Sequence, residues 1–190
     1  MEVTVRPATP ADAPRLSEIY AYYVEHTAVS FEYAAPSAAE FRRRMAAVCE
    51  KYPYFVAERG GRVIGYAYAH AFVGRAAYDW SAELTVYLEP SARRQGAGRA
   101  LYAALEAALG RMGVTNLYAC IGVPTQENDP YLNEDSLEFH RRMGFSLVGT
   151  FRCCGRKFGR WYDMVWMEKC IAPHRPDCPP VTPYPALPEE

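Results

Sequence analysis

The spacing of apolar residues changes along the chain, and the change separates predicted helices from predicted strands. Val3–Arg6 alternates between apolar and polar positions like a short strand. A helix-start pattern at Thr9–Asp12 is followed by apolar residues every three or four positions up to Val24. A second helix is predicted after Ser37, which can form a capping box with Glu40.

After residue 52 the pattern becomes that of strands alternating with helices. Tyr54–Glu58 and Val63–His70 are predicted strands joined by a Gly-Gly turn, and Ala82–Leu88 is a third. The later elements are a helix over Ala100–Met112, a strand over Leu117–Val123, a helix over Asn133–Met143, and strands over Ser146–Phe151 and Trp161–Lys169. This order predicts one α/β domain with a mixed sheet.

The last 18 residues differ in composition from the rest. Seven prolines lie between Pro173 and Pro188, so residues 173–190 can form neither a regular helix nor a central strand. We therefore expect a domain over residues 1–172 and a proline-rich tail over residues 173–190, with Tyr184 and Leu187 as anchors.

Composition narrows the functional classes. The chain has 21 basic and 22 acidic residues and a net charge of −1, which argues against nucleic-acid binding through bulk charge. No apolar run is long enough for a membrane helix and no signal peptide is recognised, so the expected location is the cytoplasm, with no membrane partner. The six cysteines show neither zinc-ligand spacing nor a CxxC pair, so we expect free thiols and no metal.

The segment Arg93–Arg99 (Arg-Arg-Gln-Gly-Ala-Gly-Arg) follows a predicted strand and precedes a strong helix. Helix N-termini carry unpaired amides and a partial positive charge, and Gly96 and Gly98 allow close approach of an anion. The segment is neither a P-loop nor a dinucleotide fingerprint. It predicts a pyrophosphate site, although the glycines alone would also suit an ordinary turn.

Arg93-x-x-Gly96-x-Gly98 in this setting resembles the acyl-CoA signature of the GNAT N-acetyltransferases, and Asn133-x-x-Ser136 with His140 resembles their second signature. The resemblance implies a mixed, mostly antiparallel sheet of six or seven strands with about four helices, acetyl-CoA as co-substrate, and a homodimer. The cofactor-binding residues that it implies are Thr85, Val86, Tyr87, Leu88, Arg93, Arg94, Gln95, Gly96, Ala97, Gly98, Arg99, Asn133 and Ser136.

Two further segments, Tyr78–Tyr87 and Gly155–Asp163, are similar to the phosphinothricin N-acetyltransferases. This similarity implies a small amino-acid-like amine as acceptor. Residues 123–132 form a longer loop than that group leads us to expect, near the acceptor end. A polyamine, an aminoglycoside or a protein N-terminus therefore stays open as acceptor, as does a CoA-binding sensor without turnover.

Acetylation of an amine requires a base for the ammonium proton and a proton for the leaving thiolate. Glu83, between apolar neighbours on a strand, is the base that the resemblance implies, and His140 is the acid, with the reverse assignment open. Phe31, Arg75 and Tyr78 are the expected acceptor-binding residues, because an Arg fork suits a phosphinate or carboxylate. A surface Glu and a packed core His are the alternatives.

Overall fold

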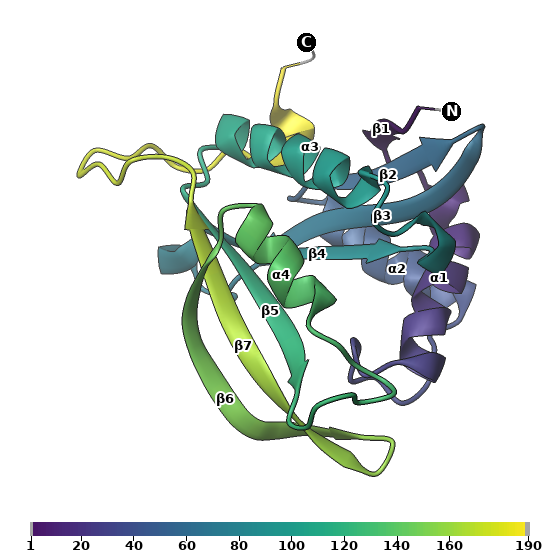
Figure 1. The fold of residues 1–190 in the computed structure, drawn as a ribbon. Helices are drawn as coiled ribbons and strands as arrows, with labels where there is room; N and C mark the ends of the chain where they lie inside the picture. The colour runs from purple at the N-terminus through teal and green to yellow at the C-terminus, as the bar shows by residue number, and fades with distance from the viewer. Residues whose placement is uncertain (1, 189–190) are drawn as a thin grey trace.

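The computed structural model describes residues 2–188, which fold around one seven-stranded sheet in the order β1-β2-β3-β4-β5-β7-β6 (Figure 1). The strands are β1 (Thr4–Pro7), β2 (Tyr54–Arg59), β3 (Arg62–Ala71), β4 (Ser81–Leu88), β5 (Asn116–Pro124), β6 (Ser146–Lys157) and β7 (Arg160–Cys170). The α-helices among the described residues are α1 (Ala13–His26), α2 (Ala38–Cys49), α3 (Ala97–Met112) and α4 (Asp135–Arg142). The predicted fold class and element order are confirmed.

The helix boundaries follow local backbone chemistry. The Thr9 amide donates to the Asp12 carboxylate at 2.7 Å, but a 3-10 turn intervenes, so α1 begins at Ala13 rather than near Thr9. The Ser37 hydroxyl caps α2 as predicted, accepting from the Glu40 amide. Helix α3 begins three residues before the predicted Ala100, directly after Gly96, whose φ of +88° a side chain would disfavour.

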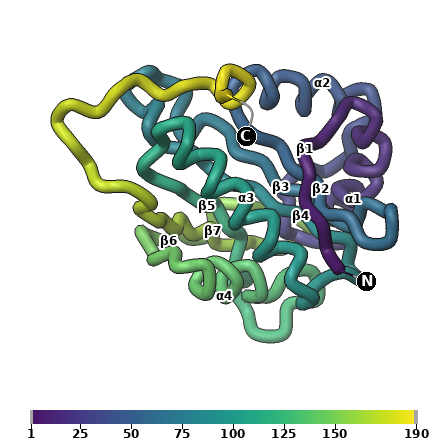
Figure 2. The backbone as a smooth tube through the Cα atoms, turned by 90° about the horizontal axis from the view of Figure 1, so that it is seen from above, coloured from purple at the N-terminus to yellow at the C-terminus, as the bar shows by residue number. Residues whose placement is uncertain are grey.

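The helices cover the two faces of the sheet unequally. Helices α3 and α4 lie on one face, and α1 and α2 pack on the other against β2, β3 and β4 (Figures 1 and 2). Each face has its own apolar cluster, one centred on Leu101, Leu105 and Leu109 of α3 and the other on Leu16, Val56 and Tyr66. No comparable helix contact covers β5, β7 and β6 on the α1–α2 face within the described residues.

Strands β4 and β5 form the one parallel pair of the sheet, and this pair is short. Only Ser81–Glu83 pairs with Asn116–Tyr118, although β4 continues to Leu88 and β5 to Pro124. All other neighbouring strands are antiparallel. The sheet therefore forks after Glu83, as the diverging ribbons of β4 and β5 show (Figure 1).

Strand β6 is longer than predicted. It was expected to end at Phe151, yet it continues to Lys157 through an irregularity in its pairing with β7 between Phe151 and Gly155. Cys153 adopts a φ of +47° there, and its amide donates to the Asp163 carboxylate at 2.7 Å. Such a bulge bends a strand without ending it, so the interrupted pattern concealed one continuous strand.

After a loop that projects from the domain (Figures 1 and 2), residues 179–187 of the proline-rich tail lie against the domain as a strap. Amides of Thr182 and Tyr184 donate to the carbonyls of Met112 and Lys51. The expected anchors, Tyr184 and Leu187, pack against the apolar cluster of the α3 face. Residue 1 of the expected domain (residues 1–172) and residues 189–190 of the expected tail (residues 173–190) lie outside the described residues. No helix within residues 2–188 is long and apolar enough to cross a membrane.

Candidate functional site

The loop between β4 and α3 presents free backbone amides. Amides of residues 94–98 donate no backbone hydrogen bond within the described chain, as expected at a helix start. Gly96 occupies the left-handed region, and a Cβ on Gly98 would come within 3.3 Å of the Phe139 ring. The two glycines therefore let the backbone turn and let α3 approach α4 closely, which leaves an electropositive cradle.

Arginines surround this cradle. The Arg93 guanidinium lies 5.1 Å from the centre of the Tyr23 ring, a cation–π distance. Arg94 forms a 2.8 Å ion pair with Asp135 at the start of α4, and Arg59 contacts Gln95. Positive charges thus border the loop amides, and the binding of an anion there stays a prediction.

Residues 84–87 of β4 lie beyond the fork and have no partner on the β5 side, whereas the amide and carbonyl of Leu88 both bond to the Tyr23 hydroxyl. Their other edge pairs with β3, in a register that places Thr85 opposite Tyr68 and Leu88 opposite Gly65. A strand with one open edge in the interior of a sheet can hydrogen-bond an extended ligand through its backbone. The cradle lies just after the end of this open edge, so the two features form one continuous site.

Glu83 is the last β4 residue that pairs with β5, so its carboxylate lies at the apex of the fork. Its side chain is 18% exposed and accepts no hydrogen bond within the described residues. Burial raises the pKa of Glu83, and the charge of His70 opposes that shift. A carboxylate with a raised pKa and no fixed partner has the properties of a general base.

His70 is a neighbour of Glu83 that sequence reasoning missed. It lies directly opposite Glu83 in the β3–β4 register, and its Nε2 is 3.7 Å from Glu83 Oε1. Paired residues share a face, so Tyr118, opposite Glu83 on β5, joins the same row. The alternation of β3 could have placed His70 on this face, but only the register shows that it faces Glu83.

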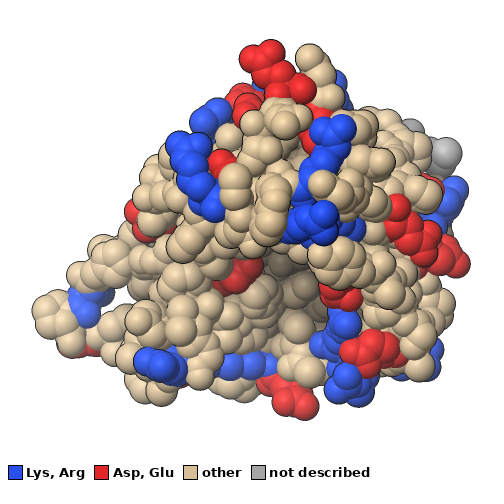
Figure 3. All heavy atoms as spheres, turned by 90° about the horizontal axis from the view of Figure 1, so that it is seen from below, with Lys and Arg blue, Asp and Glu red and all other residues tan. Residues whose placement is uncertain are grey.

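A cleft of about 320 Å³ lies beside this row, under the connection between β3 and β4. Arg75, Tyr78 and Phe72 line it, and the Phe72 ring stacks on Tyr118 at 4.1 Å. The Arg75 side chain has no hydrogen bond or ion pair within the described residues. Viewed from below, the molecule is hollowed, with acidic atoms in the hollow and basic side chains around it (Figure 3). The structure thus places Arg75 and Tyr78 in one cleft with Phe72, which joins this cleft to Tyr118 of the row, while their contact with an acceptor stays a prediction.

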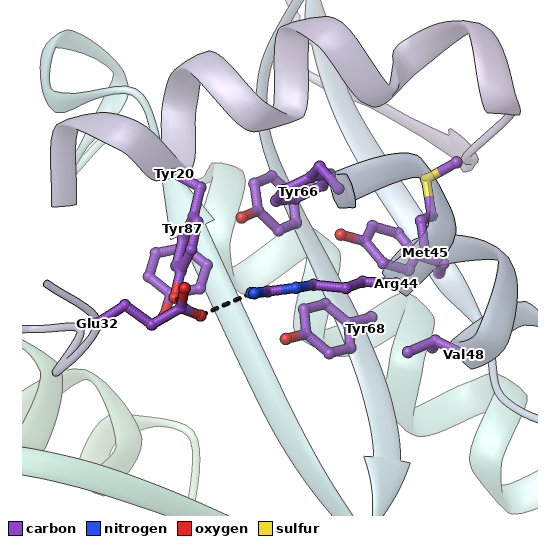
Figure 4. A pocket seen from close by; sticks show the side chains of 10 residues that line it. Tyr20, Glu32, Arg44, Met45, Val48, Tyr66, Tyr68 and Tyr87 are labelled. Carbon is purple, nitrogen blue, oxygen red and sulfur yellow. Dashed lines mark hydrogen bonds and ion pairs between the residues drawn. The ribbon is translucent and has the colours of Figure 1, made fainter. Parts of the chain in front are cut away.

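A smaller cavity of about 90 Å³ lies beneath α1 and α2 (Figure 4). Arg44 crosses it between Tyr66 and Tyr68 and forms a 2.7 Å ion pair with Glu32. Its wall is largely tyrosine: Tyr20, Tyr54, Tyr66, Tyr68 and Tyr87. Burial is the main cause that raises the pKa of each of these phenols, so they stay neutral. The ion pair and the neutral rings form a rigid border beside the face that carries Glu83.

His140 lies in a different environment from Glu83. It is 3% exposed and packs on the α3 side of the sheet, with Nε2 2.8 Å from the Tyr102 hydroxyl and Nδ1 2.7 Å from the Ser136 carbonyl. A carbonyl only accepts, so Nδ1 carries the proton and Nε2 accepts from Tyr102. Burial lowers the pKa of His140 to about 4. Both ring nitrogens are occupied, and an acid role for His140 stays a prediction.

The predicted residues at α4 have capping contacts. Asn133 Oδ1 accepts from the Asp135 amide at 3.0 Å and so closes the turn that begins the helix. The Ser136 carbonyl accepts from His140. Their predicted contacts with a cofactor stay predictions, and Asn133 lies beside the Asp135 that pairs with Arg94.

Phe31 lies in the connection between α1 and α2, where it packs against the β6–β7 hairpin. A Cβ on Gly155 would come within 2.2 Å of its ring, which also lies near Tyr162. The buried Lys157 ammonium donates to the carbonyls of Thr27 and Ser30, tying the β6–β7 hairpin to the connection between α1 and α2. Phe31 is thus held in place by the hairpin, and its predicted contact with an acceptor stays a prediction.

The long loop predicted over residues 123–132 begins two residues later, because Val123 and Pro124 still pair with β7, and residues 125–132 pack against the same hairpin. Asp129 accepts from the amides of Tyr131 and Leu132, from the Tyr162 hydroxyl and from Arg160. The Tyr131 ring stacks on Phe158 at 4.2 Å. The extra residues are therefore held in place against the hairpin, anchored by an aspartate that sequence reasoning did not identify. Among residues 2–188, no group of three or more metal-binding side chains is found.

Comparison with known proteins gives matches over nearly the whole chain. A family model described as an acetyltransferase (GNAT) domain matches residues 5–166. The chain is 35% identical over 177 residues to a phosphinothricin N-acetyltransferase of Streptomyces viridochromogenes, covering 92% of each protein. It is 29% identical over 176 residues to an L-methionine sulfoximine/L-methionine sulfone acetyltransferase of Salmonella typhimurium, covering 90% of this chain and 96% of that protein.

A solved structure agrees with the sequence matches. The crystal structure of a GNAT superfamily phosphinothricin acetyltransferase from Sinorhizobium meliloti in complex with AcCoA superposes with a TM-score of 0.83 at 34% identity. The superposition covers 97% of this chain and 99% of that one. The likeness therefore extends over nearly the whole chain and is not confined to one motif.

Proposed function

The chain belongs to the GNAT acetyltransferase family, and on that premise we propose that it moves the acetyl group of acetyl-CoA to the primary amine of a small, amino-acid-like acceptor. The observation that carries the proposal is the position of Glu83 at the apex of the fork. This position lies at the end of the open edge of β4 and one register position from Ala71, which lines the cleft.

The residues present fit acetyl-CoA. The free amides of residues 94–98 and the nearby arginines suit a pyrophosphate, which carries negative charge. The open edge of residues 84–87 offers donors and acceptors to the amides of the pantetheine arm, and the Leu88 backbone becomes available only if Tyr23 releases it. Together they direct the thioester toward Glu83.

Glu83 acts as the general base in this proposal. The acceptor arrives as an ammonium ion, and the nitrogen must lose one proton before its lone pair can attack the thioester carbonyl. The raised pKa of Glu83 makes its carboxylate a stronger base than an exposed glutamate, and this favours removal of the ammonium proton. As the carbon–sulfur bond breaks, the thiolate takes the second proton of the nitrogen, so that the products are an amide, a thiol and one proton left on Glu83.

Arg75 is the residue that we expect to select acidic acceptors. Its guanidinium is free on the rim of the cleft and can form a bidentate pair with a carboxylate or phosphinate. Tyr78 lines the same cleft and supplies an aromatic wall with a hydroxyl. Phosphinothricin and methionine sulfoximine both join a carboxylate to a primary amine, whereas a polyamine offers nothing for Arg75 to bind.

A substrate screen tests the proposal. We expect CoA release with phosphinothricin, methionine sulfoximine or other amino acids, and far slower release with spermidine, an aminoglycoside or a peptide with a free N-terminus. Arg75→Gln should raise the KM of acceptors that carry a carboxylate and leave the KM of acetyl-CoA unchanged. Arg42→Gln, on the exposed surface of α2, is the matched control. Preferential release with spermidine would contradict the proposed acceptor class.

We retain His140 as the predicted acid that protonates the leaving thiolate, although its hydrogen bonds do not favour this role. In the present geometry its one proton lies on Nδ1 and is held by the Ser136 carbonyl, so it would have to leave that bond to reach a thiolate. The arrangement supports a positioning role more directly, because the ring links α4 to Tyr102 of α3.

A homodimer is the assembly that we propose. Leu147, Val148, Phe151 and Trp161 of the β6–β7 edge are each more than half exposed, and an apolar patch of this kind typically marks an interaction surface. Light scattering should give about twice the 21.4 kDa chain mass, and Phe151→Lys should give the single mass. A wild-type protein of single mass at high concentration would contradict the dimer. A cytoplasmic location stays an expectation from the sequence.

A further inference from the structure

The proposed reaction leaves one proton on Glu83 at every turnover, because an ammonium ion and a thioester become an amide and a thiol. Glu83 has to lose that proton before the next acceptor can be deprotonated. Its side chain is only 18% exposed, so direct exchange with water is restricted. The inference below rests on the proposed function and concerns the route by which this proton leaves.

His70 lies on that route. Its Nε2 is 3.7 Å from Glu83 Oε1, and its Nδ1 is 3.2 Å from the carbonyl of Ala71. Since the carbonyl can only accept, Nδ1 carries a proton in this hydrogen bond, and Nε2 is the nitrogen left to accept one. The His70 side chain is 35% exposed, about twice as much as that of Glu83. It therefore connects the buried carboxylate to solvent.

The other titratable groups around Glu83 are the phenols of Tyr68, Tyr102 and Tyr118 and the thiol of Cys120, and neither group type ordinarily exchanges between its neutral and charged forms near pH 7. Burial raises the pKa of Tyr68, on the same strand as His70, and a hydrogen bond with Thr85 only partly opposes that shift. Across the fork, the pKa of Cys120 is raised to about 12, by desolvation and by the charge of Glu83. Burial also raises the pKa of Tyr102 on α3. An imidazole is the one group type among these neighbours that exchanges protons between pH 5 and 8.

We propose that His70 accepts the proton that Glu83 takes from the acceptor ammonium and passes it to solvent. The transfer breaks the O–H bond on Glu83 and forms an N–H bond on His70 Nε2, giving a carboxylate beside an imidazolium. Release of the proton to water or buffer restores the neutral ring, and no other reactant is needed. His70 thus acts through Glu83, as a positioning and relay residue that does not touch the acceptor.

Titration of the whole protein by NMR tests the pairing without any acceptor. With 13C-labelled Glu side chains, Glu83 and His70 should titrate as a coupled pair. His70→Asn retains a side-chain donor but cannot be protonated, so the midpoint of Glu83 should move to higher pH when the cation that favours its charged form is removed. His174→Asn, an exposed change in the tail, should leave the midpoint in place. A Glu83 midpoint that does not respond to His70→Asn overturns the relay.

Kinetics test the transfer itself. We expect His70→Asn to lower kcat by about ten-fold, less than the roughly 10²–10⁴ of a direct base, and to move the acid limb of the rate profile to higher pH. The KM of acetyl-CoA should be unchanged. Added imidazole should restore the rate of His70→Asn and leave the wild type unaffected, which a purely structural role would not produce. An unaltered kcat and pH profile in His70→Asn would overturn the relay, whereas failure of the wild type with every amine would overturn the proposed function.

Discussion

Glu83, which is largely buried, and His140, which is fully buried, are both titratable and expected from the sequence to be catalytic, yet their surroundings are opposite. Glu83 lies at the open apex of the fork and accepts no hydrogen bond within the described residues, with His70 3.7 Å away. His140 lies between α3 and α4 with both ring nitrogens bonded, to Tyr102 and to Ser136. Burial raises the pKa of the first and lowers the pKa of the second to about 4.

The difference shows that burial alone does not identify a catalytic group. Desolvation favours the neutral form of both side chains. For a carboxylate this increases the affinity for a proton and creates a base, while the missing partner leaves room for an ammonium. For an imidazole it removes the charged form, and the two hydrogen bonds then fix a neutral ring that links two helices. Glu83, the proposed reactive group, has carboxylate oxygens without a hydrogen-bond donor among the described residues, whereas both ring nitrogens of His140 are bonded.

The largest expected effect comes from removing the base. Glu83→Gln keeps the size of the side chain but cannot accept a proton, so kcat should fall by roughly 10²–10⁴. Binding of acetyl-CoA, measured by calorimetry, should be unchanged, because the cradle and open edge lie beyond the fork. Glu50→Gln, at the exposed end of α2, is the control. Nearly full activity in Glu83→Gln would remove the base from this site and erase the contrast with His140.

The next effect is on stability and acts through His140. Its pKa is about 4 in the folded protein against 6.5 in the unfolded chain, so the unfolded state binds the proton more tightly. The contribution of His140 is complete above pH 6.5 and is lost as the pH falls toward 4, by up to about 3 kcal/mol. Urea unfolding from pH 7.5 to 4 should show this loss in the wild type and a flatter dependence in His140→Gln. Equal slopes in the two proteins would mean that the ring is not held neutral.

The sequence predicted the strand that carries Glu83 and the helix that carries His140. It did not predict the neighbours of Glu83, because these depend on pairing between residues that are distant along the chain. Apolar spacing predicted the strand that carries Glu83, and the family resemblance added its role. The facing of His70 and Glu83 is set by a register across a connection of about ten residues, which periodicity does not determine. The burial of Lys157 against Thr27 and Ser30 likewise depends on contacts more than a hundred residues apart. The bulge that extends β6 to this lysine depends on irregular pairing with the neighbouring strand β7, which periodicity also does not determine.

The smallest expected effect separates a structural pair from a catalytic one. Tyr102→Phe removes the donor to His140 Nε2 and leaves a buried acceptor without a partner, which should lower the free energy of unfolding by about 1–2 kcal/mol. Because the proton of the ring lies on Nδ1, kcat should stay close to the wild-type value. Combining Tyr102→Phe with His140→Gln in a double-mutant cycle measures the coupling of the pair. A large loss of kcat in Tyr102→Phe without loss of stability would instead place the pair in the proton path, and the two buried sites would then act together.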